Sequence, residues 1–115
     1  MVSGKRWTLQ DRDGNAIYLT EERWAHVIDP LNHPEVAPFE EHIKATLRKG
    51  RRKQEPLDPR KYRYSSPFDD LPGDNTHVIV IVLFGFAIDR QGTAVPNNYV
   101  ATAFLKHIMR KGIGR

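Results

Sequence analysis

An uncharged run of eleven residues, Val78 to Ile88, constrains the fold of this chain more than any other feature. β-Branched and aromatic side chains dominate the run, which follows the turn-forming residues Leu71 to Asn75, so it predicts a strand buried on both faces. It is too short to cross a bilayer as a helix. A strand this apolar needs covering layers, and the amphipathic segments around it predict helices that supply them. We therefore expect a compact α+β domain.

Local turn and capping signals divide the rest of the chain. Asp13 and Gly14 are a hairpin signal. Thr20 can cap a helix, and Gly50 is a natural helix stop. The expected elements are a hairpin over residues 7–19, helices over 20–30 and 33–49, strands over 51–57, 60–66, 78–88 and 98–102, and a helix over 103–111. This order predicts an N-terminal β-hairpin and two helices packed on a four-stranded antiparallel sheet, with a C-terminal helix.

The composition limits the classes of protein to which the chain can belong. Its 115 residues predict a single domain, 1–115, whose core needs no disulfide or metal. The absence of cysteine excludes disulfides and thiolate zinc sites and fits a reducing cytoplasm. Residues 1–6 lack the apolar stretch of a signal peptide, so we expect a cytoplasmic protein without a membrane partner. The histidines show no metal-ligand spacing, so we expect no metal and no cofactor.

Positive charge is concentrated in two segments of a chain whose net charge is +4. The larger group lies within residues 44–63 and the smaller one within residues 106–115. If the fold brings these segments together, they would form a face that binds a polyanion such as RNA. Ordinary solvated surfaces would explain the same distribution.

His26 is the first residue that could carry chemistry. On the helix predicted after Thr20, it lies opposite the apolar stripe and one turn after Glu22. A neighbouring carboxylate favours the charged imidazole, so His26 could serve as general acid or base near neutral pH. A solvated helix face with an incidental Glu–His pair is the alternative.

Cations and tyrosines alternate over residues 61–65. In a strand, Tyr62 and Tyr64 would share one face. The other face would carry Lys61, Arg63 and Ser65. This pattern suits RNA, because cations meet phosphates and aromatic rings stack on unpaired bases. A half-buried strand, with its tyrosines inward and its cations in water, would show the same alternation.

Thr102 stands at the expected junction between the last strand and the C-terminal helix. Its hydroxyl could cap that helix, or it could face a phosphate bound at the helix N-terminus. The chain has neither a glycine-rich phosphate loop nor a GxSxG motif. P-loop hydrolysis and α/β-hydrolase chemistry are therefore disfavoured.

Four segments together resemble a known family. They are residues 19–28 (LTEERWAHVI), residues 33–35 (HPE), the strand around Arg63, and the closing residues 100–104 (VATAF). They are similar to small members of the BECR superfamily, named after barnase, EndoU, colicin-type tRNases and RelE. The greatest similarity is to its phage- and toxin-associated PBECR-type branch. The resemblance covers residues 17–111 and leaves 1–16 as an N-terminal hairpin extension.

The resemblance implies a metal-independent endoribonuclease that cleaves tRNA or mRNA, commonly a toxin neutralised by a cognate antitoxin or immunity protein. By position, it implies proton transfer by His26, phosphate stabilisation by Arg63, and assistance from Thr102. The residues expected to bind RNA are Arg51, Arg52, Lys61, Tyr62, Tyr64 and Lys106. The last motif ends in Phe104 where a tyrosine is frequent, and this departure removes one proton donor.

Two other interpretations remain open. A non-catalytic module of the same fold could bind RNA or a protein, and it would not need His26 near Arg63 and Thr102. Alternatively, the N-terminal hairpin could dock a partner by adding strands to a free sheet edge. A cleft that holds the three residues would favour the enzyme, and an exposed apolar face or a free sheet edge on residues 7–19 would favour the docking module.

Overall fold

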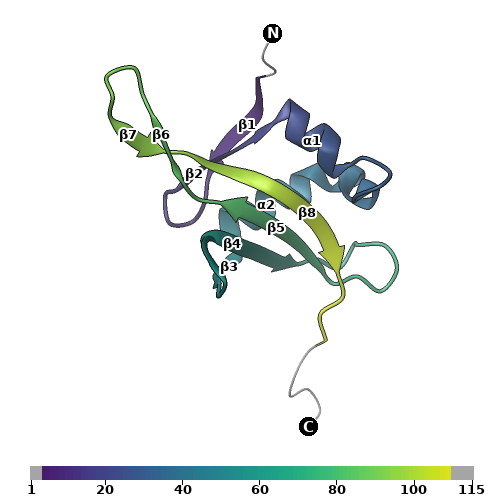
Figure 1. Ribbon diagram of the computed structural model, residues 1–115. Helices are drawn as coiled ribbons and strands as arrows, with labels where there is room; N and C mark the ends of the chain where they lie inside the picture. The colour runs from purple at the N-terminus through teal and green to yellow at the C-terminus, as the bar shows by residue number, and fades with distance from the viewer. Residues whose placement is uncertain (1–3, 110–115) are drawn as a thin grey trace.

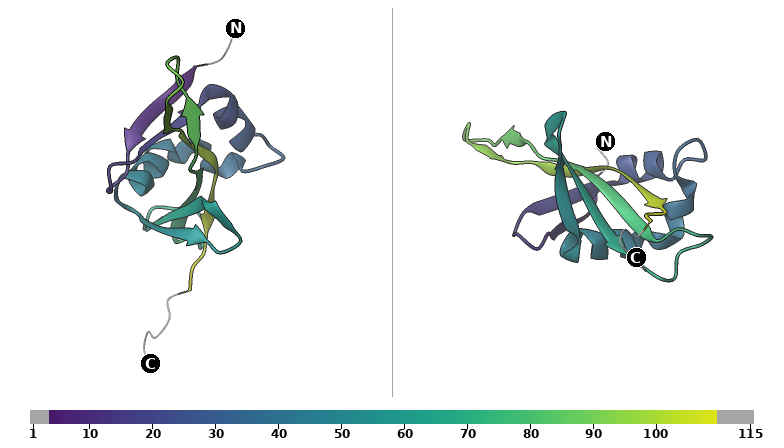
Figure 2. Two further views of the ribbon diagram at one scale, coloured as in Figure 1. Left: turned by 60° about the vertical axis from the view of Figure 1, so that its left-hand side comes forward. Right: turned by 90° about the horizontal axis from the view of Figure 1, so that it is seen from below.

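The computed structural model describes residues 4–109 of the 115-residue chain. Its helices are α1 (Glu21–Val27), the 3₁₀ helix η1 (Pro34–Phe39) and α2 (Glu40–Lys49). Its strands are β1 (Lys5–Gln10), β2 (Ala16–Thr20), β3 (Arg51–Glu55), β4 (Asp58–Pro67), β5 (His77–Leu83), β6 (Phe86–Ile88), β7 (Ala94–Pro96) and β8 (Asn98–Lys106). Figures 1 and 2 show a twisted sheet with the helices on one side of it.

Six strands form one sheet in the order β1-β2-β8-β5-β4-β3. Strands β8, β5, β4 and β3 are antiparallel neighbours and correspond to the expected four-stranded sheet. The N-terminal hairpin extends this sheet, because β2 pairs in parallel with β8 through Ile17 with Asn98 and Tyr18 with Tyr99. The α+β class is confirmed, but the sheet is six-stranded and mixed rather than four-stranded and antiparallel.

The expected helix over residues 103–111 is wrong. The segment continues β8 as far as Lys106 and pairs with β5 along its length. Ala103 lies opposite Val80 and is buried toward the helices, whereas Phe104 faces the other side of the sheet. Residues 110 and 111, the end of the expected helix, lie outside the described part of the chain. Strand pairing therefore decides the conformation of a segment whose apolar spacing also suits a helix.

The core lies between the helices and one face of the sheet. The buried side chains from the helices are Trp24, Val27, Val36, Ile43 and Leu47. They meet buried residues of the strands, among them Ile17, Leu19, Tyr64, Val78, Val80, Val82 and Val100. These contacts bury the apolar side of every strand of the main sheet except β3, which carries only charged and amide side chains.

The second helical segment differs from the expected single helix over residues 33–49. It starts as the 3₁₀ turn η1 and becomes α-helical only at Glu40. Pro34 and Pro38 explain this start, because neither has an N–H to donate within a helix. The helix ends at Lys49, and Gly50 follows as expected.

The opposite face of the sheet is not covered by any helix among residues 4–109, and we call it the open face. Its side chains form three rows across the strands: Tyr99, Leu83 and Lys61; Thr102, Ile81, Arg63 and Lys53; and Phe104, Ile79, Ser65 and Arg51. On this face Ile79 is fully buried, but Ile81 and Leu83 are half-exposed. The strand expected to be buried on both faces is therefore only partly covered on the open face.

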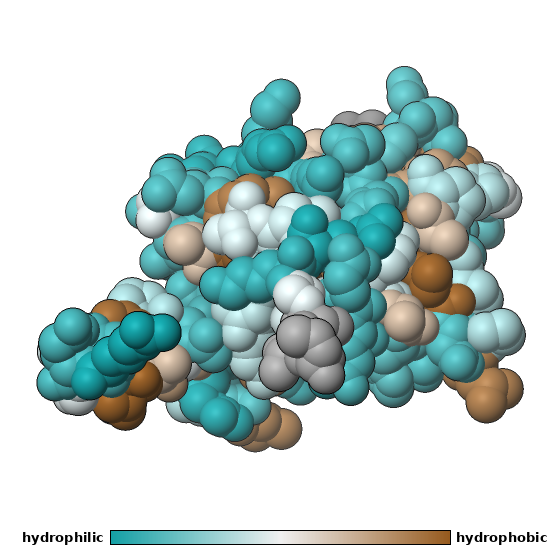
Figure 3. All heavy atoms as spheres, turned by 90° about the horizontal axis from the view of Figure 1, so that it is seen from above, coloured by the Kyte–Doolittle hydropathy of each residue, from teal (hydrophilic) through white to brown (hydrophobic). Residues whose placement is uncertain are grey.

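A second hairpin, β6–β7, projects from the body of the molecule at the left of Figure 1. It starts after Phe84 and Gly85, where the expected long strand leaves the main sheet. Phe86 and Ile88 are 75% and 68% exposed, and brown hydrophobic patches mark the hairpin in Figure 3. No helix in the described part of the chain is long and apolar enough to cross a membrane.

Candidate active site

A cavity of about 470 Å³ opens where α1 leaves β2 and passes alongside β8. We call it the α1–β8 pocket. Its lining residues are Tyr18, Thr20, Glu22, Arg23, His26, Tyr99 and Val100. The pocket exists because β2 pairs with β8 through only two residues, after which α1 takes the place of a neighbouring strand.

Thr20 determines where α1 begins. Its Oγ1 accepts a hydrogen bond from the backbone N–H of Arg23 at 3.0 Å, which confirms the expected N-cap. Trp24 is buried on the core side of the helix, whereas His26 is exposed. Arg23 and His26 are three residues apart and therefore lie on the same side of the helix.

We expect Thr20→Ala to lower the free energy of unfolding by about 1 kcal/mol, because one backbone N–H of α1 loses its acceptor. A helix of seven residues has little stability of its own, so loss of its N-cap should also disturb the pocket wall that α1 forms. Urea unfolding followed by tryptophan fluorescence measures the change. Thr20→Ser should retain most of the stability, and Thr93→Ala in the exposed β6–β7 turn is the matched control. Equal stability of the Thr20→Ala and Thr93→Ala variants would contradict the capping role.

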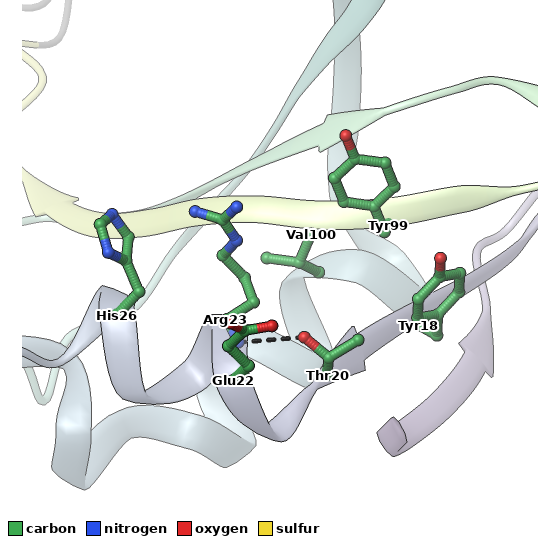
Figure 4. Close-up of a pocket in the computed structure, with 7 residues that line it drawn as sticks. All are labelled: Tyr18, Thr20, Glu22, Arg23, His26, Tyr99 and Val100. Atoms are coloured by element: carbon green, nitrogen blue, oxygen red, sulfur yellow. Dashed lines mark hydrogen bonds between the residues drawn. The ribbon is translucent and has the colours of Figure 1, made fainter. Parts of the chain in front are cut away.

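Figure 4 shows how the polar side chains are arranged in the pocket. Arg23 and His26 point in the same direction past β8, and Tyr18 and Tyr99 rise at the other end. The Tyr18 hydroxyl donates to Asn97 at 2.9 Å, and the Tyr18 ring lies 6.1 Å from that of Tyr99. The Tyr99 hydroxyl makes no hydrogen bond with a described residue, so it remains available to a ligand.

The expected ion pair between Glu22 and His26 is not formed, although both residues line the pocket. The Arg23 guanidinium likewise has no acidic partner among residues 4–109. An imidazole, a guanidinium and a phenol with a free hydroxyl can together transfer protons and stabilise an anion. In the described part of the chain, no cluster of three or more His, Asp or Glu residues could hold a metal ion.

Arg63 and Thr102 lie outside the α1–β8 pocket. They flank Ile81 in one row of the open face, so their Cα atoms are about 10 Å apart. Arg63 lines a separate hollow of about 210 Å³ with Lys53 and Glu55, and neither cation is ion-paired with Glu55. Because Thr102 lies within β8, its expected role as a helix cap is wrong, and it has no helix N-terminus beside it.

The three expected catalytic residues are therefore not in one pocket: His26 lies on α1, whereas Arg63 and Thr102 lie on the open face. Tyr99 belongs both to the α1–β8 pocket and to the open face, so the pocket and the face are continuous. The open face carries four cations on β3 and β4 that have no ion pair with a described residue: Arg51, Lys53, Lys61 and Arg63. Of the expected RNA-binding residues, Arg51 and Lys61 lie on this face. Lys106 is exposed at the end of β8, opposite His77.

The other three expected RNA-binding residues face the helices. Arg52 forms an ion pair with Asp13 and lies 4.6 Å from the centre of the Tyr62 ring. The Tyr62 ring packs against Phe84 at 4.7 Å. Tyr64 is only 1% exposed and therefore cannot stack on a base. Tyr62 and Tyr64 share one face of β4 as expected; Tyr64 belongs to the core, whereas Tyr62 is half-buried and lines a hollow with Arg60 and Phe84.

Tyr64 instead belongs to a buried polar cluster with Asp11. The Asp11 carboxylate accepts hydrogen bonds from the Tyr64 hydroxyl, the backbone N–H groups of Asp13 and Asn15, and the Asn15 side chain. Burial alone would raise the pKa of Asp11, but these hydrogen bonds outweigh it and lower the pKa below its usual value. Burial, followed by the hydrogen bond to Asp11, raises the pKa of Tyr64. The cluster fixes the β1–β2 turn to β4.

Arg23 and Tyr99 are the functional residues of the pocket that the sequence interpretation missed. For Arg23 the available signal was its spacing of three residues from His26, because both then lie on one side of a helix. Comparison with protein-family models, curated proteins and solved structures found no match for the chain. The functional assignment therefore rests on the geometry of the pocket and on the resemblance of the motifs.

Proposed function

We propose that the protein is a metal-independent endoribonuclease whose active site is the α1–β8 pocket. The observation that carries this proposal is the meeting of His26, Arg23 and Tyr99 in one pocket that continues onto a cationic open face. RNA cleavage without a metal needs a proton acceptor, a proton donor and a cation near the reacting phosphate. The pocket offers one side chain of each kind.

In the proposed reaction, His26 accepts the proton of a ribose 2′-hydroxyl, and the 2′-oxygen attacks the adjacent phosphorus. The new P–O2′ bond forms as the P–O5′ bond breaks, which leaves a 2′,3′-cyclic phosphate. The Tyr99 hydroxyl donates a proton to the departing 5′-oxygen, a role suited to a hydroxyl that has no hydrogen-bond partner among residues 4–109. Arg23 stabilises the charge on the non-bridging oxygens. Tyr99 thus supplies a phenol hydroxyl in place of the tyrosine that the resembled motif often has at the position of Phe104.

The open face would bind the rest of the RNA. Arg63 lies about two strand spacings from β8 and therefore suits a phosphate next to the scissile one rather than the scissile phosphate itself. Thr102 lies between the pocket and Arg63 and would contact the same strand through its hydroxyl. Following the resemblance to PBECR-type toxins, we extend the proposal to tRNA or mRNA in the cytoplasm as substrate, and to a cognate antitoxin or immunity protein as partner.

The test is cleavage of total RNA by purified protein in the presence of EDTA. We expect discrete products with 2′,3′-cyclic phosphate ends. His26→Gln should reduce the rate about 10²- to 10⁴-fold, because it removes the proton acceptor. Arg23→Gln should reduce the rate as well, whereas His107→Gln and Arg90→Gln, which lie outside the pocket, should not.

A non-catalytic RNA-binding module is the second candidate function. It is favoured by one observation, the separation of Arg63 and Thr102 from the α1–β8 pocket. RNA that shifts in a native gel but stays intact would support this candidate and exclude the nuclease. Cleavage that is equally fast with His26→Gln would also exclude the proposed active site. The strand-docking interpretation keeps one of its two supports: β1 is an edge strand of the main sheet, but Leu9 is buried and Trp7 packs against the core rather than forming an exposed apolar face.

A further inference from the structure

A second cavity, of about 450 Å³, lies where α2 runs into β3; Ser65 in its lining belongs to the open face, whereas Ser66 pairs with the core residue Val78 and faces the helices. We call it the α2–β3 pocket. Its lining residues are Arg12, Lys49, Gly50, Arg51, Ser65, Ser66, Pro67 and His77. Its volume falls within the range of about 300–1,000 Å³ that is usual for ligand sites.

The side chains of the α2–β3 pocket are suited to an anion. Arg12, Lys49 and Arg51 contribute three cations, and no acidic residue lines the cavity. None of the three cations forms an ion pair with a residue in the range 4–109. Asp13, the acid next to Arg12 in the chain, is already paired with Arg52.

Neutral donors complete the lining. Ser65 and Ser66 are half-buried, and neither hydroxyl donates to another described residue. Gly50 lets the Ser66 hydroxyl approach closely, because a Cβ at position 50 would lie 2.9 Å from the Ser66 Oγ. The His77 ring uses Nδ1 to contact the Thr76 hydroxyl at 2.7 Å, which leaves Nε2 as the free ring nitrogen. Cations, hydroxyls and an imidazole without a carboxylate are the groups that bind phosphate.

The two pockets are connected by the open face. Ser65 and Tyr99 are two strands apart and are displaced by four residues along β5, since they pair with Ile79 and Leu83. This displacement corresponds to a distance of about 16 Å between their Cα atoms. Arg63, without an ion pair in the described chain, lies beside this path on β4. A single strand of RNA could therefore run from one pocket to the other along cations that form no ion pair within residues 4–109.

We propose that the α2–β3 pocket binds a backbone phosphate of the RNA whose reacting phosphate occupies the α1–β8 pocket. This inference rests on the proposed function, because it assigns the second pocket to the same substrate. The ligand is a phosphodiester, held by Arg12, Lys49 and Arg51 and oriented by the Ser66 hydroxyl beside Gly50. Only an RNA long enough to span both pockets would then make all of these contacts, so affinity should depend on RNA length.

The test measures binding of a fluorescent all-deoxy oligonucleotide without terminal phosphates, by fluorescence anisotropy at low salt. This probe lacks the 2′-hydroxyl and cannot be cleaved by the proposed reaction. We expect Arg12→Gln and Arg51→Gln each to weaken binding about tenfold, since each removes a charged contact to phosphate. Arg90→Gln removes the same charge from the distant β6–β7 turn and should change binding by no more than about twofold.

A second readout follows the backbone amides of Gly50, Ser65 and Ser66 by NMR during the same titration. Their signals should shift in a saturable manner with the wild-type protein. Equal affinities of the Arg12→Gln, Arg51→Gln and Arg90→Gln variants would overturn the proposal. Amides that respond to inorganic phosphate but not to the oligonucleotide would overturn the assignment to RNA backbone.

These outcomes are independent of the nuclease assay. If the oligonucleotide binds as expected but the protein leaves RNA intact in EDTA, the phosphate pocket stands and the proposed reaction fails. If the protein cleaves RNA but the Arg12→Gln and Arg51→Gln variants bind like Arg90→Gln, the reaction stands and the α2–β3 pocket has no part in it.

Discussion

Gly50→Ala is expected to destabilise the protein by about 3 kcal/mol, because there is no space for a methyl group at this position. A Cβ on residue 50 would lie 2.4 Å from the carbonyl oxygen of Thr46 and 2.8 Å from that of Ser65. Both are backbone atoms, one in α2 and one in β4, so neither can move away without shifting a whole element. Urea unfolding followed by tryptophan fluorescence measures the loss.

Gly85→Ala is the matched control. Gly85 also joins two elements and also lacks a positive φ, but its Cβ would meet its nearest neighbour, the Asn97 carbonyl oxygen, at 3.6 Å. We therefore expect it to cost less than about 1 kcal/mol. If Gly50→Ala is as stable as Gly85→Ala, the close packing of α2 on β4 at this point is refuted.

Asp11→Ala should cost about 3 kcal/mol, because it removes a buried carboxylate that accepts four hydrogen bonds. The Tyr64 hydroxyl would then be buried without its partner. Tyr64→Phe removes the same hydrogen bond from the other side and should cost less, since three donors to Asp11 remain. The double variant Asp11→Ala/Tyr64→Phe should be more stable than the sum of the single losses predicts. Additive losses would show that the two residues act separately.

The pH dependence of stability provides a second check on Asp11. Its pKa is lowered in the folded protein, so as pH falls the unfolded chain takes up the proton first. The contribution of the carboxylate is therefore complete above its unfolded pKa of about 3.9 and is lost as pH falls toward the folded value. We expect the difference in stability between the wild type and Asp11→Asn to shrink below about pH 4. A difference that grows on acidification would mean that the folded pKa is raised instead.

Local signals were sufficient to predict most of the fold. The Asp13-Gly14 turn and the Thr20 cap act within a few residues of themselves, and both are found where expected. Gly50 also ends α2 as expected, but for a different reason. Its φ of −69° lies outside the left-handed region, and glycine is required there by the close approach of backbone atoms from another element.

The features that could not be predicted depend on contacts between distant segments. Residues 103–105 have apolar side chains that fit either a helix or a strand, and pairing with β5 makes this segment a strand. The parallel pairing of β2 with β8 has no local signal in either segment. The α1–β8 pocket depends on that pairing, which is why Arg23 and Tyr99 could not be placed together from the sequence.

The parallel pairing of β2 with β8 also has a consequence for the order in which the protein is made. Tyr18 and His26 are synthesised before Tyr99, which belongs to the last strand of the main sheet. The N-terminal hairpin and α1 can complete the sheet only when β8 has been added between β2 and β5. A partly synthesised chain therefore contains His26 and Arg23 but no pocket. The proposed nuclease would be inactive on the ribosome until β8 has been synthesised.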